Sequence, residues 1–521
     1  MGKLRSDSLV LAGAFVALAY IFYEYTFIAS RVIDGTRYFW LDDDMMISMR
    51  YGRNLAEGHG LVWNAGERVE GYTNFLWTLV MAGVHLTRVA DARAAVLVRL
   101  VNLGLLTGSF VLSLRLLRVF APRARRAAPL LMVTMFMCPD VILWSVWGFE
   151  TSLLTFLSLL FLVRLLVHGR DPIAFAALGL IPLTRGDGIY VFAAYALIAV
   201  VITSERRQTL LWLGAAFVPA ILHLAFRRVY YGDWLPNTYY LKVYGVEALH
   251  ARGFAYGRAF VFDHAVLLTL AAAAAVRTLR TDRRGVILFV MVLSALGYVV
   301  LTGGDMFGFF RFFAHVMPVI FVFATLGIVT VARDTLARAA WAAVLLLVSV
   351  PLVAPLRRLL INSSNGDPER QLQVALIVKK HALPESTVAV YCAGIVPYFT
   401  RLQALDLLGK SDRHIARLDA FPGAMIGHGK VDPVYSLAQS PDLVVTCSTN
   451  YGAAASFVPA KQTPDPMWTI IASEPFRTRY LPNPVLESYL LQQTAVYTHS
   501  GSKEHPRRNW DVIDVGSSAV P

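Results

Sequence analysis

Long apolar runs separated by short polar breaks dominate the first two thirds of the chain. About twelve such runs lie at residues 8–28, 72–90, 96–118, 127–146, 150–168, 172–185, 188–204, 208–228, 258–276, 285–302, 312–332 and 338–356. A helix needs about 20 apolar residues to cross the hydrocarbon core of a bilayer. The pattern therefore predicts a polytopic α-helical membrane protein. The first run is too long for the core of a cleavable signal peptide, so we interpret it as a signal anchor.

Basic residues between the runs predict the orientation of the helices. Lys3 and Arg5 place the N-terminus in the cytoplasm, so that residues 29–71 lie outside. A dense basic cluster after the third run belongs inside: Arg115, Arg118, Arg123, Arg125 and Arg126. One of the two preceding runs therefore cannot span, and we choose 72–90 as interfacial or re-entrant because it begins with polar and aromatic residues. About eleven spans result, and the remaining basic loops also fall inside.

The C-terminal part of the chain differs from the apolar part. Pro, Asn, Asp and Ser punctuate short apolar runs such as 388–391 and 443–445, which predicts a small soluble α/β domain. The odd number of spans places this domain outside. The predicted division is a transmembrane domain over 1–356, with a large first outer loop over 29–95, and an extracytoplasmic α/β domain over 357–521.

Composition agrees with a membrane protein, because 56% of the residues are hydrophobic and only 16% are charged. A soluble chain has about a quarter charged residues. The net charge of +13 would suit a nucleic-acid-binding protein, but the cations cluster between apolar runs, where they set topology. The cysteines Cys138, Cys392 and Cys447 show no metal-binding spacing. Cys392 and Cys447 could pair in an oxidising compartment, but we expect two separate thiols.

The predicted topology gathers acids and bases on the outer face. Ionisable residues at a membrane boundary are costly and are usually functional when they converge. Carboxylates could act as a base, and Arg and Lys suit phosphate binding. Tryptophans on the same side could stack on sugars or form an interfacial belt. The polar residues of the outer loops include Asp42, Asp43, Asp44, Arg50, Arg53, Glu57, His59, Glu67, Arg68, Glu70, Glu150, Arg185, Asp187, Asp233, Asn237, Lys242, Asp305 and Arg311.

The acidic triplet 42–44 comes directly after the first span and before a helix-like run at 45–57. Such acids often only stabilise the N-terminus of a helix. Here mutual repulsion would also raise one of their pKa values, which suits a general base. Structural roles stay open elsewhere: Arg185–Asp187 and Asp305–Arg311 could be ion pairs, and Glu150 could cap a helix.

One long segment resembles a known family. Residues 43–77 have the sequence DDMMISMRYGRNLAEGHGLVWNAGERVEGYTNFLW. This segment resembles the bacterial polyprenyl-phosphate-dependent glycosyltransferases of the GT-C fold, especially the arabinofuranosyltransferases that add terminal arabinofuranose to mycobacterial cell-wall arabinan. Shorter pieces that match are GFET at 148–151, LPNT at 235–238, GGD at 303–305 and the blocks 183–188, 391–398 and 406–409.

The resemblance implies an enzyme that moves a sugar, with arabinofuranose expected, from a polyprenyl-phosphate donor to a cell-envelope glycan or protein. It implies a location in the bacterial inner (plasma) membrane with the active face outside. Related enzymes place an essential aspartate in the first outer loop, which matches Asp43 or Asp44. That aspartate would take the acceptor proton or stabilise an oxocarbenium-like transition state.

Other residues receive roles in the same hypothesis. Arg311 and Lys242, with Arg185, would neutralise the donor phosphate. No residue spacing demands a metal, although the converging carboxylates could hold a divalent ion. The alternative functions are a flippase or transporter of polyprenyl-linked saccharides and a non-catalytic assembly subunit. A transporter would be expected to carry ionisable residues near mid-membrane or paired broken helices. Residues expected to bind the sugar or the acceptor are Glu150, Asp305, Asn237, Tyr72 and Asn74.

Overall fold

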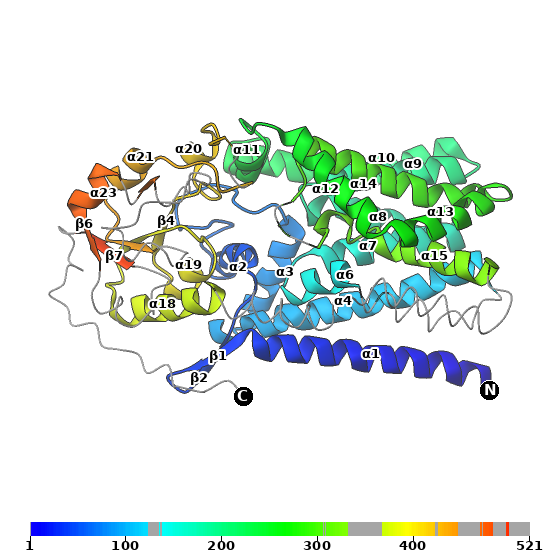
Figure 1. The fold of residues 1–521 in the computed structure, drawn as a ribbon, viewed down its shortest axis with the longest axis horizontal. Helices are drawn as coiled ribbons and strands as arrows, with labels where there is room; N and C mark the ends of the chain where they lie inside the picture. The colour runs from blue at the N-terminus through cyan, green and yellow to red at the C-terminus, as the bar shows by residue number, and fades with distance from the viewer. Residues whose placement is uncertain are drawn as a thin grey trace.

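The computed structural model describes residues 2–122, 135, 138–305, 307, 309–331, 367–422, 426–445, 469–470, 473–482 and 496–499. Helices gather into a bundle at one end of the molecule, and a smaller sheet with short helices lies at the other end (Figure 1). The helices of the bundle are α1 (Gly2–Ile28), α4 (Asp91–Phe120), α6 (Pro139–Val146), α7 (Thr151–His168), α8 (Pro172–Thr184), α9 (Gly188–Ile202), α10 (Arg206–Tyr231), α12 (Leu249–Asp263), α13 (Ala265–Leu279), α14 (Val286–Thr302) and α15 (Met317–Val331).

Four of the described helical stretches are long and apolar enough to cross a membrane. They are α4, α7, α10 and Arg283–Thr302, in which the single turn η2 (Arg283–Gly285) leads into α14. Much of α10 carries apolar side chains on its exposed surface, including Leu211, Leu222 and Val229. Large exposed apolar surfaces are uncommon on soluble monomers, and lipid tails would cover this one. The described chain is therefore mostly helical with several apolar helices, as the hydropathy pattern predicts.

One detail of the predicted topology changes, and another agrees with the choice of 72–90 as the run that does not span. The run 258–276 is not one straight helix, because α12 and α13 are bent by 80° where they meet at His264. The run 72–90 contains only the short helix α3 (Phe75–Leu86), and 12 residues are too few to cross the hydrocarbon core. The count of about eleven spans stays a prediction, since 338–356 and part of 127–146 lie outside the described residues.

The sheet at the other end of the molecule has five strands in the order β4-β3-β5-β7-β6. The central strand β3 pairs in parallel with β4 and β5, whereas β7 pairs antiparallel with β5 and β6. Residues 388–390 of β3 are fully buried, as expected for a strand covered on both faces. The strands are β3 (Thr387–Val390), β4 (Gln403–Asp406), β5 (Leu443–Val445), β6 (Tyr480–Pro482) and β7 (Val496–His499).

Short helices accompany the sheet, and a small hairpin precedes the junction with the bundle. The helices are α18 (Asp367–His381), α19 (Ile395–Thr400), α20 (Arg413–Ala416), α21 (Pro433–Ala438) and α23 (Glu474–Arg479). The hairpin consists of β1 (Ser30–Ile33) and β2 (Thr36–Phe39), joined by Asp34 and Gly35, both with positive φ. The predicted domain boundary at residue 357 lies outside the described residues, so it stays a prediction.

Helix α2 (Asp43–Ala56) joins the two ends of the molecule by packing beside α19. Asp43 accepts hydrogen bonds at the start of α19, whereas Arg50 and Arg53 donate to the carbonyl groups of Pro397 and Tyr398 near its end. The first N–H groups and last carbonyls of a helix have no partner within it, and they carry partial positive and negative charge. The acidic start of α2 therefore faces the positive N-terminal end of α19, and the two arginines of α2 face its negative C-terminal end.

The cysteines correct one prediction. Cys392, two residues after β3, is disulfide-bonded, whereas Cys138 is a buried free thiol. The expectation of two separate thiols at Cys392 and Cys447 is therefore wrong for Cys392, while Cys447 lies outside the described residues.

Candidate active site

The acidic triplet lies at the first turn of α2, half-buried between the bundle and the sheet. Asp42 is the N-cap residue, and its Oδ1 accepts a hydrogen bond from the backbone N–H of Asp44 at 3.1 Å. Burial, followed by the charges of Asp44 and Asp43, raises the pKa of Asp42 to about 7. The side chain of Asp42 therefore serves to cap the N-terminus of α2. Its two neighbours face different partners.

Asp43 holds the start of α19. Its Oδ1 accepts from the backbone N–H of Ile395 at 2.7 Å, and its Oδ2 accepts from that of Gly394 at 3.3 Å. Burial raises the pKa of Asp43 to about 6, although Lys410 and the two N–H groups oppose this effect. Both oxygens of this carboxylate are engaged in joining α2 to the sheet region.

Asp44 pairs with Lys410, whose Nζ lies 2.5 Å from Oδ1. The exposed fraction of the side chain is 20% for Asp44 and 9% for Lys410. Burial raises the pKa of Asp44, but Lys410, Lys242 and Arg311 together outweigh it, so that the pKa lies well below its ordinary value. Asp44 is therefore an ionised carboxylate held in the field of three cations.

A cavity of about 410 Å³, here called the large cavity, is lined in part by Lys242 and Arg311. Apolar side chains of α10, including Phe217, Ile221 and Leu224, form part of its lining. The remaining lining comes largely from α11 (Asn237–Lys242), α14 and the loops at their ends. An apolar wall next to charged groups suits a ligand with a hydrocarbon part and an anionic part. Its charged lining residues are Arg185, Asp187, Arg227, Lys242, Asp305 and Arg311.

The cations of the large cavity differ in how far they are neutralised. Arg311 pairs with Asp305 at 2.8 Å, and its guanidinium lies 5.0 Å from the ring centre of Phe149. Arg185 lies between two carboxylates, those of Asp187 at 2.8 Å and Glu150 at 3.2 Å. Lys242 has no carboxylate within 4 Å among the described residues, and burial lowers its pKa. Lys242 is therefore the cation most available to an incoming anion.

Two predicted sugar-binding residues lie in a buried network behind Arg185. The Nδ2 of Asn74 donates to Oε2 of Glu150 at 3.1 Å, and Oδ1 of Asn74 accepts from the hydroxyl of Ser48 at 2.9 Å. Glu150 precedes α7 but makes no capping hydrogen bond with its side chain. The network therefore connects α2 and α3 to Arg185. Only Arg185 among these residues lines the large cavity.

Two further predicted residues are engaged in structural contacts. Asn237 donates through Nδ2 to the carbonyl groups of Gly409, Lys410 and Asp412 at 2.9, 3.2 and 2.9 Å. The hydroxyl of Tyr72 lies 3.0 Å from that of Tyr231, and both side chains are buried. Asn237 thus fixes the segment that carries Lys410.

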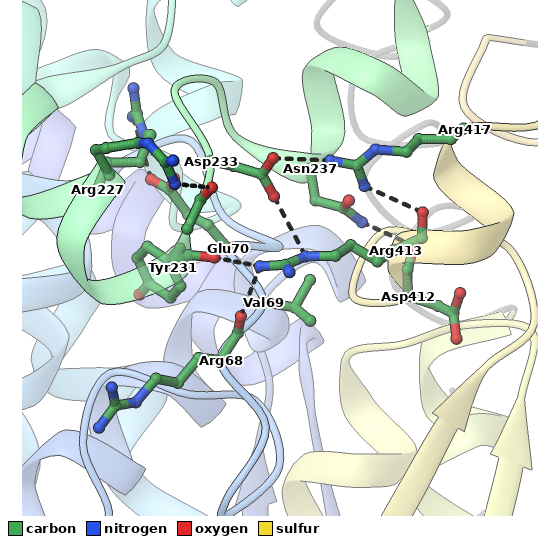
Figure 2. A network of polar contacts seen from close by, with 12 residues as sticks. Arg68, Val69, Glu70, Arg227, Tyr231, Asp233, Asn237, Asp412, Arg413 and Arg417 are labelled. Atoms are coloured by element: carbon green, nitrogen blue, oxygen red, sulfur yellow. Dashed lines mark hydrogen bonds and ion pairs between the residues drawn. The ribbon is translucent and has the colours of Figure 1, made fainter.

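An ion-pair network supports the same segment (Figure 2). Asp233 follows α10 and reaches Arg413, the first residue of α20, at 3.2 Å and Arg417, its C-cap, at 2.9 Å. Arg227 of α10 pairs with the buried Glu70 at 2.5 Å. These contacts join the end of α10, the loop before α3 and the 409–417 segment, so the position of Lys410 depends on both halves of the molecule.

Lys410 is the residue that sequence reasoning missed. It lies directly after the 406–409 block, which already matches the family pattern, and that adjacency was the one available signal. Among the residues that the structure describes, no group of three or more His, Cys, Asp or Glu side chains is placed to hold a metal ion.

Comparison with solved structures identifies the fold. ArnT from Cupriavidus metallidurans bound to undecaprenyl phosphate aligns with a TM-score of 0.55 at 13% identity, over 95% of this chain and 98% of that one. The oligosaccharyltransferase of Archaeoglobus fulgidus aligns with a TM-score of 0.53 at 13% identity, over 86% and 70%. The fold is that of the GT-C glycosyltransferases. The predicted GT-C architecture is therefore confirmed.

Sequence comparison adds a specific resemblance to this GT-C fold. A terminal β-(1→2)-arabinofuranosyltransferase of Mycobacterium tuberculosis is 31% identical over 224 residues. The match covers 38% of this chain and 34% of that protein, so it spans about a third of the relative's length. A family described as a domain of unknown function (DUF8728) matches residues 362–494. The predicted resemblance to the mycobacterial family is confirmed.

Proposed function

We propose that this protein is a membrane glycosyltransferase that transfers arabinofuranose from a polyprenyl-phosphate donor to a glycan or protein of the cell envelope. The observation that carries the proposal is the ionised carboxylate of Asp44 within the field of Lys242 and Arg311, both of which line a cavity with an apolar wall. The resemblance to arabinofuranosyltransferases supports the choice of sugar.

The large cavity suits the donor in two ways. The apolar side chains of α10 would contact the first isoprenoid units, and Lys242 and Arg311 would bind the phosphate. Arg185 would add a third positive charge, although two carboxylates already balance most of it. That ArnT has been solved with undecaprenyl phosphate supports a lipid phosphate as the ligand of this fold.

Asp44 would act at the anomeric carbon. An acceptor hydroxyl forms a bond to that carbon, the bond from the carbon to the phosphate oxygen breaks, and the hydroxyl proton passes to Asp44. The phosphate leaves with the bonding electron pair and is stabilised by Lys242 and Arg311, so electrostatic stabilisation supplies much of the rate. Because the arriving phosphate also attracts these cations, they neutralise Asp44 less, and its basicity rises when the donor is bound.

The remaining polar groups would position the sugar and the acceptor. Asp305 lines the large cavity beside Arg311 and would accept a hydrogen bond from a sugar hydroxyl. Glu150 and Asn74 would hold Arg185 in place from behind. Tyr72 and Asn237 would maintain the walls of the site, since the contacts described above already occupy their polar groups.

The proposed location is the inner membrane of a bacterium, with the active face and the sheet outside the cytoplasm. The arginine-rich breaks between apolar runs support this orientation. The disulfide at Cys392 supports it independently, because disulfides persist in oxidising compartments.

Reconstitution tests the proposal. Full-length protein in lipid vesicles is incubated with synthetic polyprenyl-phosphate arabinofuranose and an arabinan fragment, and the products are analysed by mass spectrometry. We expect the fragment to gain one pentose and the lipid phosphate to be released, and we expect Lys242→Ala to reduce both. Movement of the intact donor across the vesicle membrane without bond cleavage would contradict the proposal and favour a flippase.

A further inference from the structure

A second cavity of about 200 Å³, here called the small cavity, lies near the C-terminal end of α2. Arg50, Arg53 and Arg401 line it together with Glu57, His59 and Ala65. None of these residues lines the large cavity. Arg53 follows Asp44 by nine residues on the same helix, and a rise of 1.5 Å per residue separates them by roughly 14 Å. The small cavity is therefore distinct from the proposed transfer site.

Positive charge in the small cavity is incompletely neutralised. Arg50 and Arg53 are each 3% exposed. Arg50 donates to neutral acceptors, which include the carbonyl of Leu402 and Oδ1 of Asn64, both at 2.8 Å. The carboxylate of Asp91 lies 3.4 Å from Arg53 and is shared with Arg401, which it approaches at 2.9 Å. The buried pair Arg50 and Arg53 therefore has only the carboxylate of Asp91 beside it, and Arg401 also binds that carboxylate. Buried charge without a full counter-charge is destabilising.

The carboxylates near the small cavity do not pair with Arg50. Glu57 is exposed and already pairs with Arg401 at 2.9 Å. Glu67 accepts hydrogen bonds from Asn64 at 3.0 Å and from Gln403 at 2.6 Å, and among the described residues no carboxylate lies within 4 Å of the Arg50 guanidinium. Burial, followed by the charge of Arg53, lowers the pKa of Arg50 to about 9. A bound anion would offset both effects.

Arg53 also has an unused donor. Its hydrogen bonds to Asp91 and to the carbonyl of Tyr398 leave from Nη1. Its Nε is buried and has no acceptor among the described residues. A buried donor without an acceptor is destabilising, and an arginine commonly satisfies Nε and one Nη together with two oxygens of a single oxyanion.

We propose that the small cavity is an oxyanion-binding site, which takes a phosphate or carboxylate group against Arg53 and Arg50. The group is either free in solution or a substituent of the acceptor. The second source rests on the proposed transferase function, whereas oxyanion binding itself does not.

A binding experiment tests the site without requiring transfer. Inorganic phosphate is titrated into full-length Lys242→Ala protein, which removes the most available cation of the large cavity, and the unfolding temperature is recorded. We expect a saturable rise. Ala65 is exposed on the cavity lining, so Ala65→Glu would add a carboxylate to the lining that carries Arg53, whereas Ala65→Lys would add a cation.

The matched pair of variants separates binding from misfolding. In the Lys242→Ala background, Ala65→Glu should raise the starting unfolding temperature and weaken phosphate binding by about tenfold or more, whereas Ala65→Lys should retain binding. The absence of a saturable phosphate response in Lys242→Ala, or equal responses from the two Ala65 variants, would overturn the proposal.

Transfer kinetics then identify the source of the oxyanion. If the acceptor carries it, Ala65→Glu alone should raise the KM for the acceptor and leave the KM for the donor unchanged. If the ligand is free phosphate, both KM values stay the same while phosphate binding is still lost. Either result supports the site.

Discussion

Replacement of Lys410 by methionine perturbs the charge that neutralises Asp44 while keeping most of the side-chain volume. Lys410 contributes a charged hydrogen bond of 2.5 Å to Asp44, and its side chain is only 9% exposed. Hydrogen bonds to charged groups contribute about 1.5–3 kcal/mol. One pH unit of pKa corresponds to about 1.36 kcal/mol, so Lys410→Met should raise the pKa of Asp44 by about one to two pH units.

The sign of the stability effect follows from the direction of the wild-type shift. The pKa of Asp44 is lowered in the folded protein, so its stabilising contribution is present above the ordinary aspartate pKa and is lost as the pH falls below it. Lys410→Met should therefore lower the free energy of unfolding at neutral pH by about 1.5–3 kcal/mol. It should also move the acidic limb of the transfer rate upward by the same one to two pH units.

The assay is the rate of sugar transfer as a function of pH, with thermal unfolding measured in parallel. Lys430→Met is the matched control, because Lys430 is a buried lysine that donates to the backbone carbonyl groups of Tyr240, Tyr244 and Ala416. The control should lose stability but keep the wild-type acidic limb. An unchanged acidic limb in Lys410→Met would refute the assignment of Asp44 as the titrating carboxylate.

Three other perturbations test the junction between the bundle and the sheet. A Cβ on Gly394 would overlap the backbone carbonyl of Asp43, so Gly394→Ala should lower the unfolding temperature, whereas Gly83→Ala, with open space around it, should not. Asn237→Ala removes an NH2 group whose two hydrogens are shared among three carbonyl groups of the segment that carries Lys410. At about 1 kcal/mol per hydrogen bond, both stability and transfer rate should fall; unchanged kinetics would contradict this positioning role. The pKa of Asp43 is raised to about 6, so protonated Asp43 stabilises the folded protein and this stability is lost as the pH rises from about 4 to 6. Asp43→Asn should therefore flatten the plot of unfolding temperature against pH in this range. An unchanged wild-type slope would contradict the raised pKa.

Hydropathy predicted the helical bundle well because a chain in lipid must satisfy its backbone hydrogen bonds within helices. The bend at His264 was not predictable in the same way. The apolar run 258–276 contains neither proline nor glycine, and only the polar pair Asp263 and His264 interrupts it at the bend. At the bend, Nε2 of His264 lies 3.0 Å from Oδ2 of Asp140 in α6, a contact between distant segments that periodicity does not report.

For a similar reason, the sequence predicted only part of the candidate site. Asp44, Lys242 and Arg311 belong to motifs or boundary loops that a sequence pattern can single out, and the structure brings their charges together. Lys410 lies 366 residues from Asp44 in the sequence. Its approach depends on how α2 docks against α19, and no local pattern encodes that contact.

The most direct test of the central claim is single-turnover transfer by Asp44→Asn compared with Asp43→Asn, with donor binding measured for both. General-base catalysis contributes about 10²–10⁴-fold, so Asp44→Asn should lose transfer by that factor while it still binds the polyprenyl-phosphate donor. Asp43→Asn keeps an oxygen for the N–H of Ile395 and should retain most of the rate. Near-normal transfer by Asp44→Asn, with the loss confined to Asp43→Asn, would contradict the account.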